Sequence, residues 1–233
     1  MIKTTNLRKI YLTEEVETTA LNNVNIEINE GEFVSIMGPS GCGKSTLLNI
    51  LGLLDNPTDG EYFFLGHEVS NHSERQRAQL RKKNIGFVFQ SFNLIDELTV
   101  YENVELPLLY LGYSSSERKE KINAVLERME IMHRQSHFPQ QLSGGQQQRV
   151  AVARALASQP SFVLADEPTA NLDSVTANNL LDLMEKLNEE HKMTFVFSTH
   201  DARVIERAHR VVTLRDGRIE KDEVRQNSKV NAT

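Results

Sequence analysis

GPSGCGKST, at residues 38–46, carries the strongest structural signal in this sequence. An apolar run over residues 33–37 precedes it and suits a buried strand. A helix is predicted to follow from Lys44 to about Leu54, because the residue before Pro57 disfavours helical backbone. A glycine-rich loop between a strand and a helix is the setting in which this spacing binds phosphate. We therefore predict an α/β fold with a nucleotide site at the N-terminus of that helix.

The residues of this loop have separate predicted roles. Its glycines let the backbone curl and point successive N–H groups at phosphate oxygens. Lys44 is predicted to neutralise the β- and γ-phosphates of ATP, and the Ser45 hydroxyl to bind Mg²⁺. A glycine-rich turn without a ligand is the alternative interpretation, and the strand–loop–helix order disfavours it. The predicted nucleotide-binding residues of the loop are Gly38, Pro39, Ser40, Gly41, Cys42, Gly43, Lys44, Ser45 and Thr46.

An acidic pair follows a second apolar strand, at residues 162–167, FVLADE. Ligands of open parallel sheets bind at the carboxyl ends of the strands, where this pair is expected to project. Asp166 suits a role in holding Mg²⁺, directly or through water. Glu167 lies one residue further toward the γ-phosphate and is the predicted general base for the attacking water. The alternative is an Asp-Glu pair that simply ends a strand in solvent.

LSGGQ, at residues 142–146, lies between these two motifs and predicts a second anion site. Gly144 and Gly145 leave backbone N–H groups uncovered at the start of a helix, and Ser143 supplies a hydroxyl. One ATP does not need two such sites from one chain. The alternative, in which Ser143 is an ordinary helix cap beside flexible glycines, explains the local structure but not its occurrence together with the other motifs.

Composition and charge exclude several classes of protein. The 233 residues have a formal net charge of −6, which argues against non-specific nucleic-acid binding. Cys42 is the single cysteine, so no disulfide is expected within the chain and a reducing compartment is expected. The longest apolar stretches, such as residues 47–54, fall far short of the ~18–20 residues that span a bilayer. We expect no signal peptide and no direct membrane insertion, so any role at a membrane requires a partner.

Strands and helices are predicted to alternate on both sides of a helical stretch. This pattern favours a mainly parallel sheet. Ser116 is the predicted cap of an amphipathic helix that ends near Met129. We predict one domain over residues 1–222, with a core at about 1–90 and 160–220, a helical subdomain at about 91–158, and a polar tail at 223–233. The other predicted elements are strands at 24–28, 62–65, 85–89, 162–165 and 194–198, helices at 73–83, 175–190 and 202–208, and a closing hairpin at 211–219.

The order of the phosphate loop, LSGGQ and the acidic strand resembles that of the ATP-binding cassette (ABC) ATPases, over nearly the whole chain. The resemblance implies a RecA-like P-loop NTPase core, an N-terminal antiparallel β subdomain and an inserted α-helical subdomain. It also implies a head-to-tail homodimer with two ATP molecules at the interface. Four residues of each chain would then contact the ATP held by the other chain's phosphate loop: Ser143, Gly144, Gly145 and Gln146.

Other positions match the motifs of this family one by one. Gln90 resembles the Q-loop glutamine, a ligand of Mg²⁺ and water, so the implied metal-binding residues are Ser45, Gln90 and Asp166. His200 resembles the switch histidine that touches the γ-phosphate, and the implied catalytic residues are Lys44, Glu167 and His200. Tyr11 falls where relatives place an aromatic ring that stacks on adenine, although an ordinary strand tyrosine is the alternative. Residues 171–173 match the D-loop, whose commoner serine is replaced here by Ala170; Cys42 likewise replaces a commoner serine.

Longer matches narrow the resemblance within the family. The amino-acid sequence of these stretches most resembles the lipoprotein-releasing (LolD-type) and macrolide-exporter (MacB-type) ATPases. This resemblance implies transmission of motion to a permease with four transmembrane spans and a large extracytoplasmic domain. MacB-type proteins fuse the permease to the cassette, so a LolD-like arrangement with a separate permease fits this chain better. That arrangement would place the chain on the cytoplasmic face of the membrane. The matches are GEFVSIMGPSGCGKSTLLNILGLLD at 31–55, IGFVFQSFNL at 85–94, TVYENVELPL at 99–108 and LADEPTANLD at 164–173.

Residues 90–113 are the predicted contact surface for the permease. Their apolar side chains are too many for one small subdomain to bury, so part of the set is expected to form a groove for a short permease helix. The set comprises Phe92, Leu94, Ile95, Leu106, Leu108, Leu109 and Tyr110.

Other functions share parts of this pattern. An amino-acid or metal-ion importer ATPase has the same catalytic motifs, and a cell-division type that signals through its permease has the same architecture. DNA-repair cassettes need a long coiled-coil insertion and translation-factor types usually carry two cassettes, so a single cassette of 233 residues favours neither.

Overall fold

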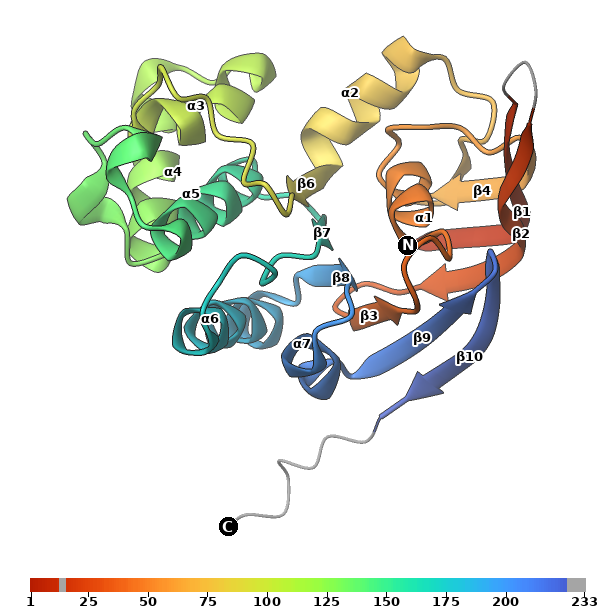
Figure 1. The fold of residues 1–233 in the computed structure, drawn as a ribbon. Helices are drawn as coiled ribbons and strands as arrows, with labels where there is room; N and C mark the ends of the chain where they lie inside the picture. Colours follow the sequence, from red (N-terminus) through yellow and green to blue (C-terminus); the bar gives the residue numbers. More distant parts are fainter. Residues whose placement is uncertain (13–15, 226–233) are drawn as a thin grey trace.

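The computed structural model describes residues 1–12 and 16–225, which fold into an α/β structure with two sheets and a group of helices (Figure 1). The first sheet is antiparallel, in the order β2-β1-β4-β5. The second has the order β10-β9-β3-β8-β7-β6, and all its neighbouring strands are parallel except the β9–β10 hairpin. The predicted mainly parallel core and N-terminal antiparallel sheet are therefore confirmed.

The bounds of the elements are close to those expected from the apolar patterns. The strands are β1 (Ile2–Leu12), β2 (Glu17–Ile28), β3 (Phe33–Met37), β4 (Asp59–Phe64), β5 (His67–Glu68), β6 (Ile85–Val88), β7 (Phe162–Asp166), β8 (Thr194–Ser198), β9 (Arg210–Arg215) and β10 (Arg218–Val224). The α-helices are α1 (Lys44–Leu51), α2 (Glu74–Asn84), α3 (Val100–Leu111), α4 (Ser115–Arg128), α5 (Gly144–Ala157), α6 (Ser174–His191) and α7 (Ala202–Arg207). Two short 3₁₀ helices, Met132–Arg134 and Pro139–Gln141, join α4 to α5.

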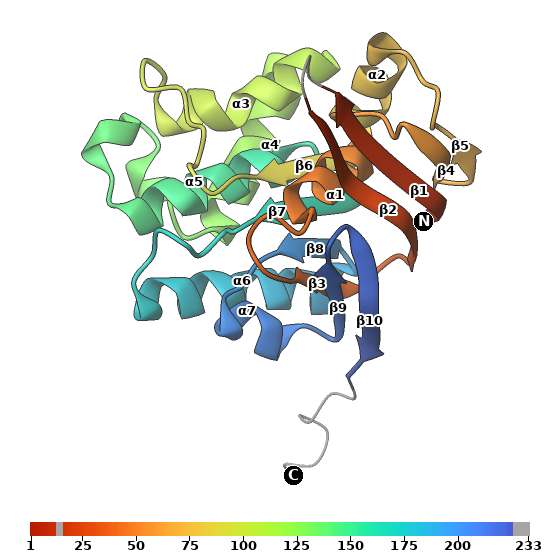
Figure 2. The same ribbon diagram turned by 45° about the vertical axis from the view of Figure 1, so that its right-hand side comes forward.

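The parallel sheet is buried on both faces, which explains its nearly continuous apolar strands. Successive residues of β7 alternate between two core clusters: Val163 packs with α5 and α6, whereas Leu164 packs with α1 and the antiparallel sheet. Figures 1 and 2 show α1 between the two sheets, and α6 and α7 on the other side of the parallel sheet. The helix that follows the phosphate loop is thus packed between the two sheets.

The helices α3, α4 and α5 form a group of their own between β6 and β7 in the chain (Figure 1). Their apolar faces join the larger core cluster through residues such as Val104, Ile122 and Val150. None of the helices in the described ranges is long and apolar enough to cross a membrane.

Several boundary predictions were wrong. Strand β2 begins at Glu17, seven residues before the predicted start at residue 24. Helix α4 is capped by Ser114 rather than Ser116, because Glu117 completes a capping box with Ser114. Helix α1 ends at Leu51, with Gly52 as its C-cap, one turn earlier than expected. The predicted tail begins too early, since Glu223 and Val224 still pair with β9; residues 226–233 of that tail lie outside the described residues.

Candidate nucleotide site

The phosphate loop turns sharply between β3 and α1. Gly43 adopts φ 105° directly before α1, and a Cβ there would lie 2.5 Å from the carbonyl oxygen of Ala20. At Gly38 a Cβ would lie 2.1 Å from the carbonyl oxygen of Leu214. The loop backbone is therefore packed too closely against its neighbours for any side chain at these two positions.

The loop also has the features of an anion cradle. No side chain caps the N-terminus of α1, so its first N–H groups are free of side-chain acceptors. A Cβ at Gly41 would meet no other atom within 4 Å, so this part of the loop faces open space. Lys44 Nζ donates to the carbonyl oxygens of Gly38 at 2.8 Å and Pro39 at 3.0 Å, which holds the ammonium group over the loop. These features fit a nucleotide phosphate group.

Cys42 faces the protein interior rather than this open side. Its side chain is buried in the cluster around α1, and its carbonyl oxygen accepts from Gly217 N at 3.0 Å. The β9–β10 turn therefore supports the loop from behind. The Cys42 N–H donates to the Pro39 carbonyl oxygen at 3.3 Å, so its predicted contact with an anion would replace that bond and would leave the thiol buried.

Three parallel strands bring the other candidate residues to the same edge. In the order β3-β8-β7, the chain leaves β3 into the phosphate loop, β8 toward Thr199 and His200, and β7 toward Glu167. Asp166 pairs with Ser198 at the last step of the β7–β8 ladder. Because the carboxyl ends of parallel strands lie on one edge, the phosphate loop and the acidic pair share that edge of the sheet.

Glu167 is fixed by an unusual backbone conformation and by bonds to both carboxylate oxygens. Its φ is +47°, a left-handed value that is uncommon for a non-glycine residue, and its N–H donates to Ser198 O at 2.8 Å. Its Oε2 accepts from the Thr199 hydroxyl at 2.9 Å, and its Oε1 lies 2.7 Å from His200 Nδ1. The Glu167 side chain is 14% exposed and that of His200 76%, so the histidine is the partner that solvent reaches.

A polar network behind Glu167 was not predicted from the sequence. The Thr199 hydroxyl accepts from Asp201 N at 3.0 Å, and Asp201 Oδ2 accepts from the Thr169 hydroxyl at 2.5 Å. The hydrogen bond from Arg203 is the largest of the effects on Asp201 and lowers the pKa of that carboxyl to about 2. The network ties the residue after β8 to the turn after β7. The one feature of the sequence that could have indicated this network is Asp201, a residue type that commonly caps a helix N-terminus and does so here for α7.

The Q-loop is held from two sides. Asn171 Nδ2 donates to the Gln90 carbonyl oxygen at 2.9 Å, which joins the D-loop to the Q-loop. Arg154, on α5, donates to the carbonyl oxygens of Phe92 at 2.8 Å and Asn93 at 2.5 Å. Arg154 was missed in the sequence, where its signal is a cation within the small and apolar second half of α5, residues 150–157.

LSGGQ lies away from the phosphate loop. Figure 1 shows α5 packed with α3 and α4, whereas α1 lies beside the antiparallel sheet. Ser143 caps α5 in a capping box with Gln146, so the local helix-cap interpretation of Ser143 is also realised. A Cβ at Gly145 would lie 2.1 Å from Thr176 Cγ2 on α6, so this glycine is required by packing.

Tyr11 lies on β1 with its ring 41% exposed. Its hydroxyl donates to Asp55 Oδ2 at 3.2 Å, and Lys9 Nζ lies 5.0 Å from the ring centroid. These contacts orient the side chain and place the Lys9 ammonium group over one face of the ring, and the role of Tyr11 toward adenine stays a prediction.

A family model described as ABC transporter matches residues 21–170. The chain belongs to the ABC transporter family. Its domain is thus that of an ABC ATPase, as the motif order predicted.

Two relatives and one solved structure show how far this likeness extends. An uncharacterized ABC transporter ATP-binding protein of Methanocaldococcus jannaschii, MJ1508, is 50% identical over 94% of this chain and 97% of its own length. The macrolide export ATP-binding/permease protein MacB of Syntrophobacter fumaroxidans is 46% identical over 94% of this chain, which spans 31% of that protein. The solved dimeric structure of the M. jannaschii cassette MJ0796, in a post-hydrolysis state with ADP and Pi, is 48% identical. The two structures superpose with a TM-score of 0.90, and the alignment covers 97% of this chain and 99% of the MJ0796 chain.

This ABC ATPase is therefore an ATP-binding subunit of an ABC transporter. The solved relative, which covers nearly the whole chain, confirms the predicted fold of the cassette.

Proposed function

We propose that this chain hydrolyses ATP to power a separate membrane permease, of the lipoprotein-releasing or MacB-like type that transmits motion across the membrane. The observation that carries the proposal is the common sheet edge at which the phosphate loop, Asp166 and the Glu167–His200 pair meet. An anion cradle on the same sheet edge as a partly buried carboxylate suits phosphoryl transfer to water.

Binding and hydrolysis can be assigned to particular atoms. Lys44 Nζ exchanges the carbonyl oxygens of Gly38 and Pro39 for phosphate oxygens, because a charged acceptor makes the stronger hydrogen bond. Glu167 accepts a proton from the attacking water through Oε1 after His200 turns away from it, while Thr199 keeps Oε2 in place. His200, exposed to solvent, is then free to contact the γ-phosphate.

A divalent ion fits the residues between the two motifs. The Ser45 hydroxyl, the Asp166 carboxylate and the Gln90 amide are oxygen ligands of the kind that Mg²⁺ accepts alongside phosphate oxygens and water. When bound, the ion would neutralise charge that develops on the phosphates.

We further propose that two copies of the chain close over two ATP molecules. Ser143, Gly144, Gly145 and Gln146 lie on α5, away from the phosphate loop of their own chain, and would meet the γ-phosphate held by the second copy. The dimeric structure of the relative MJ0796 supports this arrangement. Adenine would stack on Tyr11.

The permease is proposed to bind in a groove of about 750 Å³ between α2, β6, α3 and α5. Tyr110, 76% exposed, is the one member of the predicted apolar set that lines this groove. Other members do not: Leu108 is buried in the core, and Leu109 is exposed outside the lining. Binding there would place the chain on the cytoplasmic face of the membrane without insertion.

The enzymatic part of the proposal is tested on the purified chain. It should release phosphate from ATP when Mg²⁺ is present and lose that activity when EDTA removes the ion. A purified, folded chain that binds ATP but shows no Mg²⁺-dependent turnover, alone or with its permease, would overturn the proposal.

A further inference from the structure

The groove between α2, β6, α3 and α5 has charges of one sign. Arg81 and Lys82 line it from α2, and Arg154 lines it from α5. No Asp or Glu is among its lining residues, all of which belong to the described part of the chain. Its apolar wall includes Phe87 and Phe89, whose rings stack 5.5 Å apart. The groove is therefore both apolar and cationic.

Two of these three cations have no carboxylate partner. Arg81 forms an ion pair with Glu74 at 3.1 Å. Lys82 forms no ion pair or side-chain hydrogen bond with any other residue in the described ranges. Arg154 bonds only to the two carbonyl oxygens of Phe92 and Asn93 there, and burial lowers the pKa of its guanidinium group. Lys82 and Arg154 are thus available to an anion.

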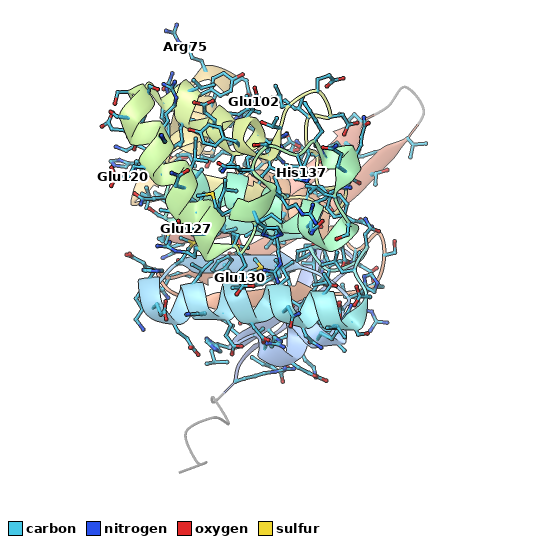
Figure 3. The ribbon with its side chains drawn as sticks, turned by 90° about the vertical axis from the view of Figure 1, so that its left-hand side faces the viewer. Arg75, Glu102, Glu120, Glu127, Glu130 and His137 are labelled. Carbon is cyan, nitrogen blue, oxygen red and sulfur yellow. The ribbon has the colours of Figure 1, made fainter. Side chains whose placement is uncertain are left out.

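Carboxylates of the helical group lie elsewhere. Figure 3 shows Glu120, Glu127 and Glu130 on the outer face of α4 and the turn after it, with Glu102 near the top of the group. The Glu105 carboxylate forms an ion pair with Arg118 at 2.7 Å. A protein segment that covered the groove would bury Arg154 further, at a cost unless the segment brought its own anion.

We propose that the permease segment in this groove is a short amphipathic helix that presents a carboxylate to Lys82 and Arg154. The inference rests on the proposed function, and it specifies the chemistry of the partner. The apolar face of the helix packs on Phe87, Phe89 and Tyr110. Its acidic side chain neutralises the two cations that the fold leaves without a carboxylate.

The position of Arg154 gives this contact a route to the nucleotide site. Phe92 and Asn93, which Arg154 holds, have left-handed φ values of 59° and 50°. Gln90 lies two residues before Phe92, and its carbonyl oxygen accepts from Asn171 of the D-loop. A carboxylate that binds Arg154 competes with the two carbonyl oxygens, so partner binding shifts the balance of Q-loop conformations.

A zero-length cross-link tests the proposal on the full chain, purified with its permease from solubilised membranes. A carbodiimide joins a lysine amine directly to a carboxylate in contact with it. We expect mass spectrometry to find Lys82 joined to an Asp or Glu in a cytoplasmic segment of an integral membrane protein. Lys82→Arg keeps the charge but has no reactive amine, so it should remove that cross-link and leave recovery of the permease unchanged. Lys83→Arg, on a neighbour outside the groove, should keep both.

Charge reversal provides the second measurement. Lys82→Glu should lower recovery of the permease at least tenfold, while basal ATP hydrolysis by the isolated chain stays within twofold of wild type. Exchange of the cross-linked permease carboxylate for lysine should restore recovery with the Lys82→Glu variant.

The outcomes separate the two proposals. Full recovery of a permease by Lys82→Glu, with carbodiimide products only at lysines outside the groove, overturns the acidic-helix inference and leaves the proposed function standing. Failure of any integral membrane protein to accompany the wild-type chain overturns both.

Discussion

His200 Nδ1 lies 2.7 Å from Glu167 Oε1, although 33 positions separate the two residues in the chain. The contact forms because β7 and β8 are parallel neighbours, so the residues that follow them share one edge of the sheet. It places an exposed, rotatable group on the carboxylate that we propose as general base. The base is therefore held in one orientation until the histidine finds another partner.

Glu167→Gln is expected to keep ATP binding, to trap an ATP-bound dimer and to lower turnover by a factor of about 10²–10⁴, because the amide retains the shape of the side chain but accepts no proton. Phosphate release and light scattering with Mg²⁺-ATP measure the two effects. Glu189→Gln, on the exposed face of α6, is the matched control and should behave as wild type. Normal hydrolysis by Glu167→Gln would exclude this residue as the base.

Lys44→Ala should reduce ATP binding, which Glu167→Gln is expected to keep. Loss of two charge-assisted contacts to phosphate, each worth about 1.5–3 kcal/mol, should weaken ATP binding at least tenfold. Equilibrium binding of a fluorescent ATP analogue measures the change. ATP affinity equal to wild type would contradict the assignment of Lys44 to the phosphates.

His200→Ala is expected to lower turnover about five- to tenfold while ATP affinity changes little, because one oriented hydrogen bond of ~1–1.5 kcal/mol is lost near the reacting phosphate. Steady-state kinetics separate kcat from KM. His191→Ala, at the exposed end of α6, serves as control. A raised KM with unchanged kcat would assign His200 to binding alone.

Gly145→Ala should destabilise the fold, because its methyl carbon would lie 2.1 Å from Thr176 Cγ2. Overpacking of this kind costs about 1–3 kcal/mol, so the melting temperature should fall by about 2–10 °C. Thr176→Ser removes the obstructing methyl group and keeps the hydroxyl that donates to Asp173 at 2.6 Å. The double variant should therefore recover most of the loss. Equal melting temperatures for the single and double variants would exclude this clash as the cause.

Asp201→Asn gives a pH-dependent prediction. The folded-state pKa of Asp201 is lowered to about 2 from 3.8, chiefly by the hydrogen bond from Arg203. A lowered carboxyl pKa contributes stability above the unfolded value, and that contribution is lost as pH falls through the folded value. The difference in unfolding free energy between wild type and Asp201→Asn should thus be constant above about pH 5 and shrink between pH 4 and pH 2. A difference that stays constant down to pH 2 would contradict this account of Asp201.

How far the sequence alone predicts this structure depends on the kind of contact. Strand β8 matches the predicted residues 194–198 because it is buried on both faces, which imposes an unbroken apolar run. The start of α4 was misplaced because Ser114, Ser115 and Ser116 can each cap a helix, and only the reciprocal bonds with Glu117 select Ser114.

Contacts between distant segments were harder to foresee. The motifs identified Glu167 and His200 separately, but their hydrogen bond depends on strand order, which local patterns do not encode. The sequence analysis predicted the groove from the apolar residues of one segment, 90–113. The cations that line the groove lie outside that segment, on α2 and α5, so they were not predicted. Arg154 was overlooked for the same reason, since its partners Phe92 and Asn93 lie about sixty residues earlier and bond through their backbone.

The most direct test of the central claim is to isolate the tagged chain from solubilised membranes and identify the integral membrane protein that accompanies it. We predict a separate permease with four transmembrane spans and a large extracytoplasmic domain, which would place the pair with the lipoprotein-releasing and macrolide-export systems. A permease with five or more spans, accompanied by a solute-binding protein, would contradict the account and make the chain the ATPase of an importer.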